Sequence, residues 1–111
     1  MSRIIEIRSY VLKPGTRFQL HALMTTQALP MLKRWDVDVV AFASPNDENA
    51  YYLIRAYDNL EALNASQDAF YGSDEWRQGP REAILALIDT YTSIVLELDE
   101  NTINGLRQPI P

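Results

Sequence analysis

The chain contains one histidine, His21, and this residue has the clearest potential for chemistry. Imidazole is the only side chain whose ordinary pKa lies near neutrality. His21 could therefore act as a general base, as a donor to a bound carbonyl, or as a haem ligand. The alternative is a buried, hydrogen-bonded histidine between a helix and a sheet. We favour that packing interpretation because the sequence reveals no partner residue.

Two arginines, Arg8 and Arg55, lie on the predicted first and third strands, which are the central strands of the predicted sheet. A guanidinium group can bind a carboxylate or an enolate oxygen in bidentate fashion. The alternative is an ion pair with Glu6 or Glu97 within an interface. Because these carboxylates are close at hand, we favour ion pairing.

The chain is also rich in tyrosine, with six residues of that type and two tryptophans. Their polar tips could orient an aromatic ligand, although such side chains also suit interfaces for their area alone. Thr25 lies on the same side of its predicted helix as His21. The candidate ligand-binding residues are Arg8, Tyr10, Thr25, Arg55, Tyr57, Trp76 and Tyr91.

Composition excludes several classes of function. The absence of cysteine rules out disulfides, thiolate metal sites and thiol nucleophiles, and a single histidine makes a metal site improbable. The four glycines form no phosphate-binding loop. A net charge of -5 without a basic stripe argues against a nucleic-acid partner. We expect neither a cofactor nor a metal.

The length of 111 residues fits one compact domain, 47% of whose residues are hydrophobic. The N-terminus leads directly into a short strand and has no signal-peptide pattern. No apolar run reaches the length of a transmembrane helix. We expect a cytoplasmic protein with no membrane association.

Hydrophobic periodicity predicts four strands and two helical crossings, the second of which is divided into two helices. Turn residues separate them, notably at Pro14-Gly15, in the polar loop 45–49 and at Gly79-Pro80. Pro30 is expected to kink or restart the first helix. The predicted strands cover 4–12, 37–44, 50–57 and 90–98, and the predicted helices cover 17–35, 59–70 and 80–89. This order predicts an α+β fold of the ferredoxin-like βαββαβ type, with a four-stranded antiparallel sheet and helices on one face.

Alternation along the first strand places Ile5 and Ile7 on one face. It places Glu6, Arg8 and Tyr10 on the other. We predict that the first face meets the helices and that the second meets a twin subunit. The candidate histidine and the charged residues would then lie on opposite sides of the sheet.

Each predicted strand keeps apolar or aromatic residues on both faces, such as Ile4, Leu12, Phe42, Tyr57 and Val95. A sheet with helices on one side only leaves its other side bare, and a monomer tolerates only limited apolar patches. We therefore predict a homodimer with its sheets packed face to face. The alternative is a monomer whose tail folds over the sheet. Residues 1–98 are predicted to form the domain, and residues 99–111 a C-terminal arm.

Four pieces of the chain, in this order, resemble the NIPSNAP family of dimeric α/β-barrel proteins. They are Glu6-Ile-Arg-Ser-Tyr-Val-Leu-Lys-Pro-Gly15, Leu29-Pro-Met-Leu-Lys-Arg34, Ile54-Arg-Ala-Tyr-Asp-Asn-Leu60 and Tyr71-Gly-Ser-Asp-Glu-Trp76. The resemblance implies a dimeric α/β barrel. The wider superfamily includes cofactor-free monooxygenases, haem-dependent enzymes, isomerase-like proteins and stress-response proteins, so the fold alone assigns no activity.

Three functions follow as hypotheses. The first is a NIPSNAP-like protein that binds a small, partly apolar organic ligand between the sheet and the helices. The second is a cofactor-independent monooxygenase or isomerase-like enzyme that uses His21. The third is a non-catalytic dimeric module. The sequence does not decide whether the protein is an enzyme.

Overall fold

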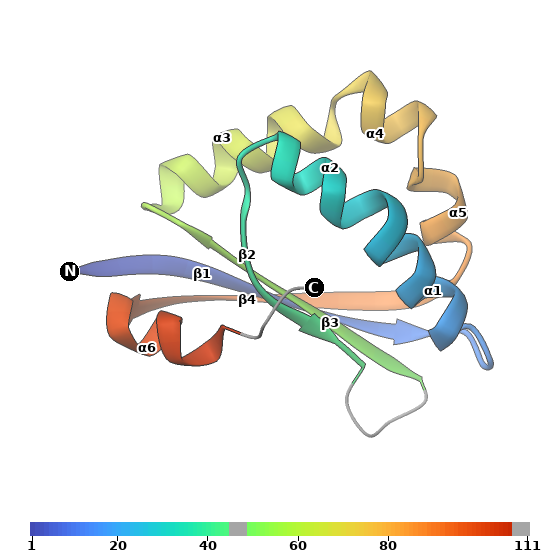
Figure 1. The fold of residues 1–111 in the computed structure, drawn as a ribbon, viewed down its shortest axis with the longest axis horizontal. Helices are drawn as coiled ribbons and strands as arrows, with labels where there is room; N and C mark the ends of the chain where they lie inside the picture. The colour runs from blue at the N-terminus through green and yellow to red at the C-terminus, as the bar shows by residue number, and fades with distance from the viewer. Residues whose placement is uncertain (45–48, 108–111) are drawn as a thin grey trace.

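The computed structural model describes residues 1–44 and 49–107, and its centre is one antiparallel sheet (Figure 1). The strands are β1 (Ser2–Leu12), β2 (Asp38–Ala43), β3 (Ala50–Tyr57) and β4 (Ile88–Asp99). They lie in the order β2-β3-β1-β4, with β1 and β3 in the centre. The order of elements and strands is ferredoxin-like, which confirms the predicted α+β fold. Most of the predicted loop 45–49 lies outside the described residues.

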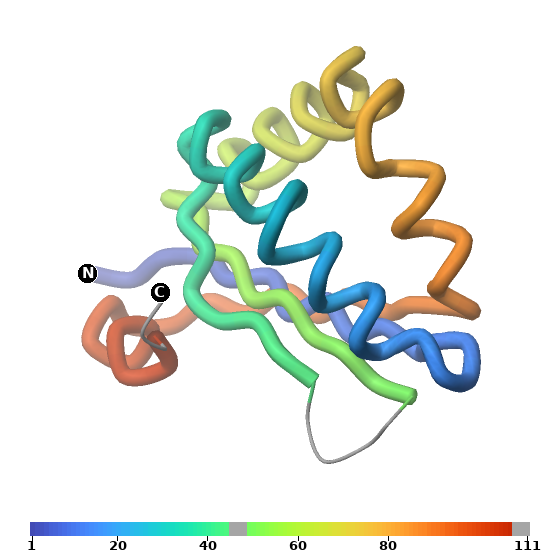
Figure 2. The backbone as a smooth tube through the Cα atoms, turned by 45° about the vertical axis from the view of Figure 1, so that its right-hand side comes forward, coloured from blue at the N-terminus to red at the C-terminus, as the bar shows by residue number. Residues whose placement is uncertain are grey.

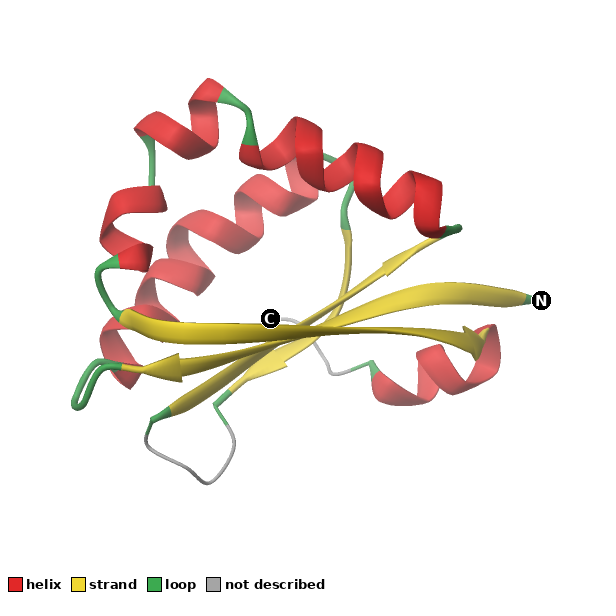
Figure 3. Cartoon of the chain, turned by 180° about the vertical axis from the view of Figure 1, so that it is seen from behind, coloured by secondary structure: helices red, strands yellow, loops and turns green. Residues whose placement is uncertain are grey.

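Two helical crossings cover one face of the sheet, and a single helix lies on the other face (Figures 1 and 3). The first crossing consists of α1 (Arg17–Leu23), the π-helical segment η1 (Met24–Ala28) and α2 (Leu29–Arg34). The second consists of α3 (Leu60–Tyr71), α4 (Asp74–Gln78) and α5 (Arg81–Leu85). The helix α6 (Glu100–Leu106) follows β4. No helix of the described residues is both long enough and apolar enough to cross a membrane.

Pro30 interrupts the first crossing as predicted. Proline has no N–H to donate within a helix, so the regular ladder cannot continue through it. In the turn before Pro30 the chain makes π-type bonds, and the amide of Leu29 donates to the carbonyl of Met24. The helix then restarts as α2 with Pro30 in its first turn.

Polar caps fix the ends of the second crossing. Asn59 Oδ1 accepts a hydrogen bond from the amide of Ala62 at 2.8 Å, and Ser73 Oγ accepts one from the amide of Trp76 at 3.2 Å. Asparagine and serine favour this N-cap position because their side-chain oxygens accept from otherwise unpaired amides of the first turn. The last helix is shorter than predicted because β4 already begins at Ile88.

The two faces of β1 are the reverse of the prediction. Glu6, Arg8 and Tyr10 face the helices, and the guanidinium group of Arg8 hydrogen-bonds to side chains of α3. Ile5 lies on the opposite face, in an apolar cluster with Ile103 of α6. Alternation alone did not identify the helix-facing side, because the polar side chains of this strand are satisfied internally, and α6 covers part of its apolar face.

The helix-side core contains most of the apolar residues that the sequence assigned to a twin subunit. Leu12, Phe42 and Tyr57 are buried there, and Ile4 packs against them. Val95 is the register partner of Glu6 and so lies on the helix side as well, where it is 43% exposed on the edge strand β4. The prediction that these residues cover the outer face is therefore wrong.

Helix α6 covers part of the outer face (Figure 2). Ile103 is fully buried against Ile5, Val40, Ala41 and Ala56. The chain after it is tied to β2 by Arg107, whose two terminal nitrogens each donate to the Asp38 carboxylate at 2.8 Å. Most of the predicted arm is thus a helix packed on the sheet, while residues 108–111 lie outside the described residues.

The part of the outer face beyond α6 exposes apolar side chains. Ile94 is 56% exposed, Val11 47% and Leu96 39%. All three lie on the same face, because their register partners belong to the outer rows of β1 and β4. An apolar surface without a cover therefore remains on the described chain.

Candidate functional site

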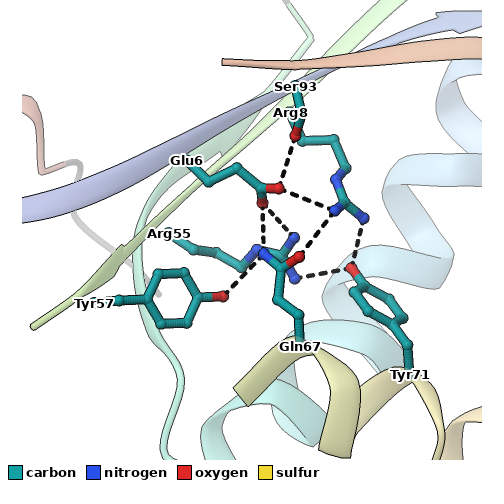
Figure 4. A network of polar contacts seen from close by, with 7 residues as sticks. All are labelled: Glu6, Arg8, Arg55, Tyr57, Gln67, Tyr71 and Ser93. Atoms are coloured by element: carbon teal, nitrogen blue, oxygen red, sulfur yellow. Dashed lines mark hydrogen bonds and ion pairs between the residues drawn. The ribbon is translucent and has the colours of Figure 1, made fainter. Parts of the chain in front are cut away.

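A buried ionic network lies between the sheet and α3 (Figure 4). The carboxylate of Glu6, from β1, is 3% exposed and accepts four hydrogen bonds. Arg55 Nη2 donates to Oε1 at 2.6 Å and Gln67 Nε2 at 2.9 Å. Ser93 Oγ donates to Oε2 at 2.7 Å and Arg8 Nη2 at 3.0 Å. Two acceptor sites on each oxygen are thereby filled, so this buried charge is well compensated.

Tyr71 of α3 joins the two arginines on their other side. Its hydroxyl oxygen accepts one hydrogen bond from Arg8 Nη1 and one from Arg55 Nη1, both at 2.8 Å. The guanidinium group of Arg8 also lies 5.2 Å from the centre of the Tyr71 ring and 5.1 Å from that of Tyr91. Cation–π contacts therefore help to hold the Arg8 charge in place.

The network shifts the ionisation of its members. Burial alone would raise the pKa of Glu6, but the charge of Arg55, the hydrogen bond from Ser93 and the charge of Arg8 together lower it to about 2. Burial is the main cause that raises the pKa of Tyr10 to about 12. Around neutral pH, Glu6 is therefore an anion and Tyr10 a neutral phenol.

A cavity of about 680 Å³ opens beside this network, between β1, β4 and the second helical crossing. Its volume lies in the range of small-molecule sites. Charged and polar groups line it together with aromatic and aliphatic walls. The lining residues include Arg8, Tyr10, Tyr71, Trp76, Ile84 and Tyr91.

The structure gathers four of the predicted ligand-binding residues around this cavity, namely Arg8, Tyr10, Trp76 and Tyr91. Two more, Arg55 and Tyr57, lie in the network behind it, where Gln67 Nε2 donates to the Tyr57 hydroxyl at 3.4 Å. Thr25 lies elsewhere. It lines a second cavity of about 640 Å³ between the first helical crossing and β2, with Phe42 and Lys33.

His21 lines neither cavity. Its side chain is exposed, and its Nδ1 lies 2.8 Å from the hydroxyl of the buried Tyr51. Tyr51 is paired with Tyr10 in the sheet, so His21 is on the same side of the sheet as the charged residues, contrary to the prediction. Burial raises the pKa of the Tyr51 phenol, so the phenol is neutral where it contacts the imidazole.

Three residues of the network were not singled out from the sequence. Gln67 and Tyr71 are four positions apart on α3 and so lie on one helical face, a spacing that could have revealed them. Ser93 carries no such signal. It reaches Glu6 because it faces Arg8 across the β1–β4 ladder, and that register is known only from the structure.

The carboxylates of the site do not form a metal centre. Among residues 1–44 and 49–107, no three His, Cys, Asp or Glu side chains come together as metal ligands would. Arginine, tyrosine and glutamine dominate instead. The chemistry available to these groups is the binding of an oxyanion and hydrogen bonding to a ligand.

Fold and site together define the class of protein. It has a ferredoxin-like α+β fold, with a polar network between the sheet and the second helical crossing. The family model NIPSNAP matches residues 5–98, and the chain belongs to the NIPSNAP family. No curated protein matches the chain.

Solved structures support the same fold. The chain resembles an uncharacterised NIPSNAP-like domain protein from Burkholderia xenovorans with a TM-score of 0.80 and 17% identity, over 98% of this chain and 91% of that chain. A NIPSNAP family protein with unknown function from Agrobacterium tumefaciens gives a TM-score of 0.78 and 18% identity, over 86% and 87%. A putative antibiotic biosynthesis monooxygenase from Nitrosomonas europaea gives 0.64 and 8%, over 84% and 95%.

Proposed function

We propose that this NIPSNAP protein binds a small, partly apolar organic molecule in the cavity of about 680 Å³ between the sheet and helices α3, α4 and α5. The observation that carries the proposal is the composition of this cavity. A charged floor formed by Arg8 meets walls formed by Trp76, Ile84 and Tyr91. Binding sites for small molecules combine apolar walls with a few fixed polar groups in this way.

The ionic network supports the proposal because it holds the polar side of the cavity rigid. Arg8 is fixed by Glu6, Gln67 and Tyr71, with donor–acceptor distances of 2.8–3.3 Å. A side chain fixed before binding loses little entropy when a ligand arrives. The network thus acts as a preorganised base for the site.

A blocked cavity tests the proposal. We expect 2-naphthoate or its neutral amide, 2-naphthamide, to bind the protein in calorimetric titrations. We expect Leu85→Trp to weaken that binding at least about tenfold, because an indole at this position fills the space that the probe needs. Leu85 lines the cavity and is 44% exposed, so the larger side chain fits the fold.

The matched control is Leu60→Trp, an equally large change at the start of α3. Leu60 is 53% exposed and lines neither cavity. Its variant is expected to bind the probes like the parent protein. Failure of both probes to bind the parent protein, or equal weakening in the two variants, would contradict the proposal.

A cofactor-independent oxygenase or isomerase-like activity is the second candidate. The likeness in fold to the putative monooxygenase and the hydrogen-bonded pair of His21 and Tyr51 favour it. Under this alternative His21 carries the proton transfer. Its exposed position outside the two cavities makes it the second choice, and a non-catalytic dimeric module is the third.

We also propose that the protein is a homodimer joined through the outer faces of its sheets. Val11, Ile94 and Leu96, which α6 leaves exposed, support this proposal. Light scattering at micromolar concentration is expected to give twice the 12.7 kDa mass of one chain. Ile94→Glu is expected to shift that mass toward one chain, because a buried unpaired carboxylate opposes association. Phe18→Glu, at a residue that is 77% exposed on α1, is the control and should leave the dimer intact.

A further inference from the structure

The ionic network beside the cavity carries a surplus of positive charge. Arg8 and Arg55 share a single buried carboxylate, that of Glu6. Among the other charged groups at the cavity, Arg81 is offset by Asp68 and by the exposed Glu82, with which it pairs at 3.4 Å. The network of Arg8, Arg55 and Glu6 itself has a net charge of about +1 within a protein whose net charge is -5. A local charge opposite to that of the whole molecule favours an anionic ligand at this position.

Arg8 is the cation that a ligand meets. It lines the cavity, whereas Arg55 is 1% exposed and lies behind it. The Nε atom of Arg8 is buried and has no hydrogen-bond partner among the described residues. The side chain of Arg8 is 13% exposed and shares its only carboxylate with Arg55, so its charge is incompletely compensated, and an anion in the cavity would supply the missing charge.

Tyr71 adds a second group at the same place. Its oxygen accepts hydrogen bonds from both arginines, so its own proton points away from them. No described residue accepts that proton, and Tyr71 lines the cavity. The proton of this hydroxyl group is therefore free to be donated to an oxygen atom of a ligand that lies against Arg8.

The walls define the rest of the ligand. Besides Tyr71, the aromatic side chains of Tyr10, Trp76 and Tyr91 line the cavity with Ile84 and Ile88. Aromatic walls pack well against a flat ring. We infer that the ligand is a planar aromatic carboxylate, an inference that rests on the proposed function. Arg8 and the hydroxyl of Tyr71 bind its carboxylate group. Glu6 acts as a positioning residue that holds Arg8 from behind.

A pair of matched probes tests this inference. 2-Naphthoate and 2-naphthamide have the same ring, and only the first carries a charge. We expect the carboxylate to bind at least about tenfold more tightly than the amide at low salt, because hydrogen bonds to charged groups are the stronger ones. Added salt should reduce this preference and leave the affinity for the amide unchanged.

Two variants assign the preference to residues. Arg8→Gln is expected to bring the ratio of the two affinities close to one. Tyr71→Phe, which keeps the ring against Phe70 and Trp76, is expected to reduce the ratio severalfold. Arg77→Gln makes the same charge change at an exposed residue of α4 outside both cavities and should leave the ratio unchanged. Circular dichroism verifies that each variant is folded.

The outcomes separate the inference from the proposed function. Equal binding of carboxylate and amide, blocked by Leu85→Trp, would overturn the inference and leave the proposed function standing. Binding of neither probe would overturn both. If Arg8→Gln does not fold, the test rests on Tyr71→Phe and on the salt dependence of the parent protein. A preference for the carboxylate over the amide that neither Tyr71→Phe nor salt reduces would overturn the inference.

Discussion

Glu6→Gln is expected to lower the free energy of unfolding by about 3–5 kcal/mol. The substitution keeps the shape of the side chain but removes the one carboxylate that compensates both the buried Arg55 and the partly buried Arg8. The new amide nitrogen is also a donor, and it would face groups that are themselves donors. Urea unfolding near neutral pH measures the loss. Glu97→Gln, at an exposed carboxylate on β4 that accepts from Ser2 at 2.7 Å, is the control and should cost less than about 1 kcal/mol.

The stability of the parent protein and that of Glu6→Gln should depend differently on pH in the acid range. The pKa of Glu6 is about 2 in the folded protein against an ordinary value of 4.5, so its stabilising effect is complete above pH 4.5 and is lost as the pH falls toward 2. That shift corresponds to about 3 kcal/mol. The difference in stability between the parent and Glu6→Gln should therefore shrink toward zero across this window. A difference that stayed constant with pH would show that the charge of Glu6 does not stabilise the network.

Ile103→Ala is expected to cost about 2–4 kcal/mol, because Ile103 is fully buried and its removal leaves a cavity between α6 and the sheet. Ile103 packs in the apolar cluster that contains Ile5 and Val40, and an alanine at position 103 would cover those two side chains poorly. Urea unfolding at one fixed protein concentration is the measurement, since association of the chains would add to the apparent stability.

Leu106→Ala is the matched control on the same helix. Leu106 is 42% exposed, so its truncation should cost less than about 1 kcal/mol. If Ile103→Ala also cost less than about 1 kcal/mol, the packing of α6 on the sheet would not contribute to the stability of the fold. A large loss in Ile103→Ala alone would extend the cooperative unit beyond the 5–98 range that the family model matches.

Local signals in the sequence were sufficient for the architecture. The strand 50–57, the cap residues Asn59 and Ser73 and the restart at Pro30 all follow from alternation or from the chemistry of one residue. These effects act within a few residues along the chain. For that reason the order βαββαβ could be predicted without knowledge of any long-range contact.

The side on which each face of β1 packs could not be predicted in the same way. A rule that places apolar residues toward the core fails when one covered face is built from charges that satisfy one another. Glu6 and Arg8 meet their partners Gln67 and Tyr71 across more than fifty positions of sequence. Only the three-dimensional arrangement shows that these polar groups are compensated inside the fold.

The position of His21 illustrates a second limit. The helical phase correctly directs its ring toward the sheet, where it meets Tyr51 and Phe42. Phase does not tell how deeply a residue lies, and His21 sits near the rim, where solvent reaches it. The candidate site is therefore built on the arginines, which are fixed by long-range contacts, and not on this histidine.

The composition of β4 has a consequence for the unfolded and partly folded chain. It spans 12 residues and forms one edge of the sheet, pairing only with β1 among the described residues. Between Thr90 and Leu96 it carries neither charge nor proline, and it is rich in β-branched residues. Such an edge is a template for pairing with other chains. The yield of refolding should therefore fall as protein concentration rises, with aggregation beginning at this strand.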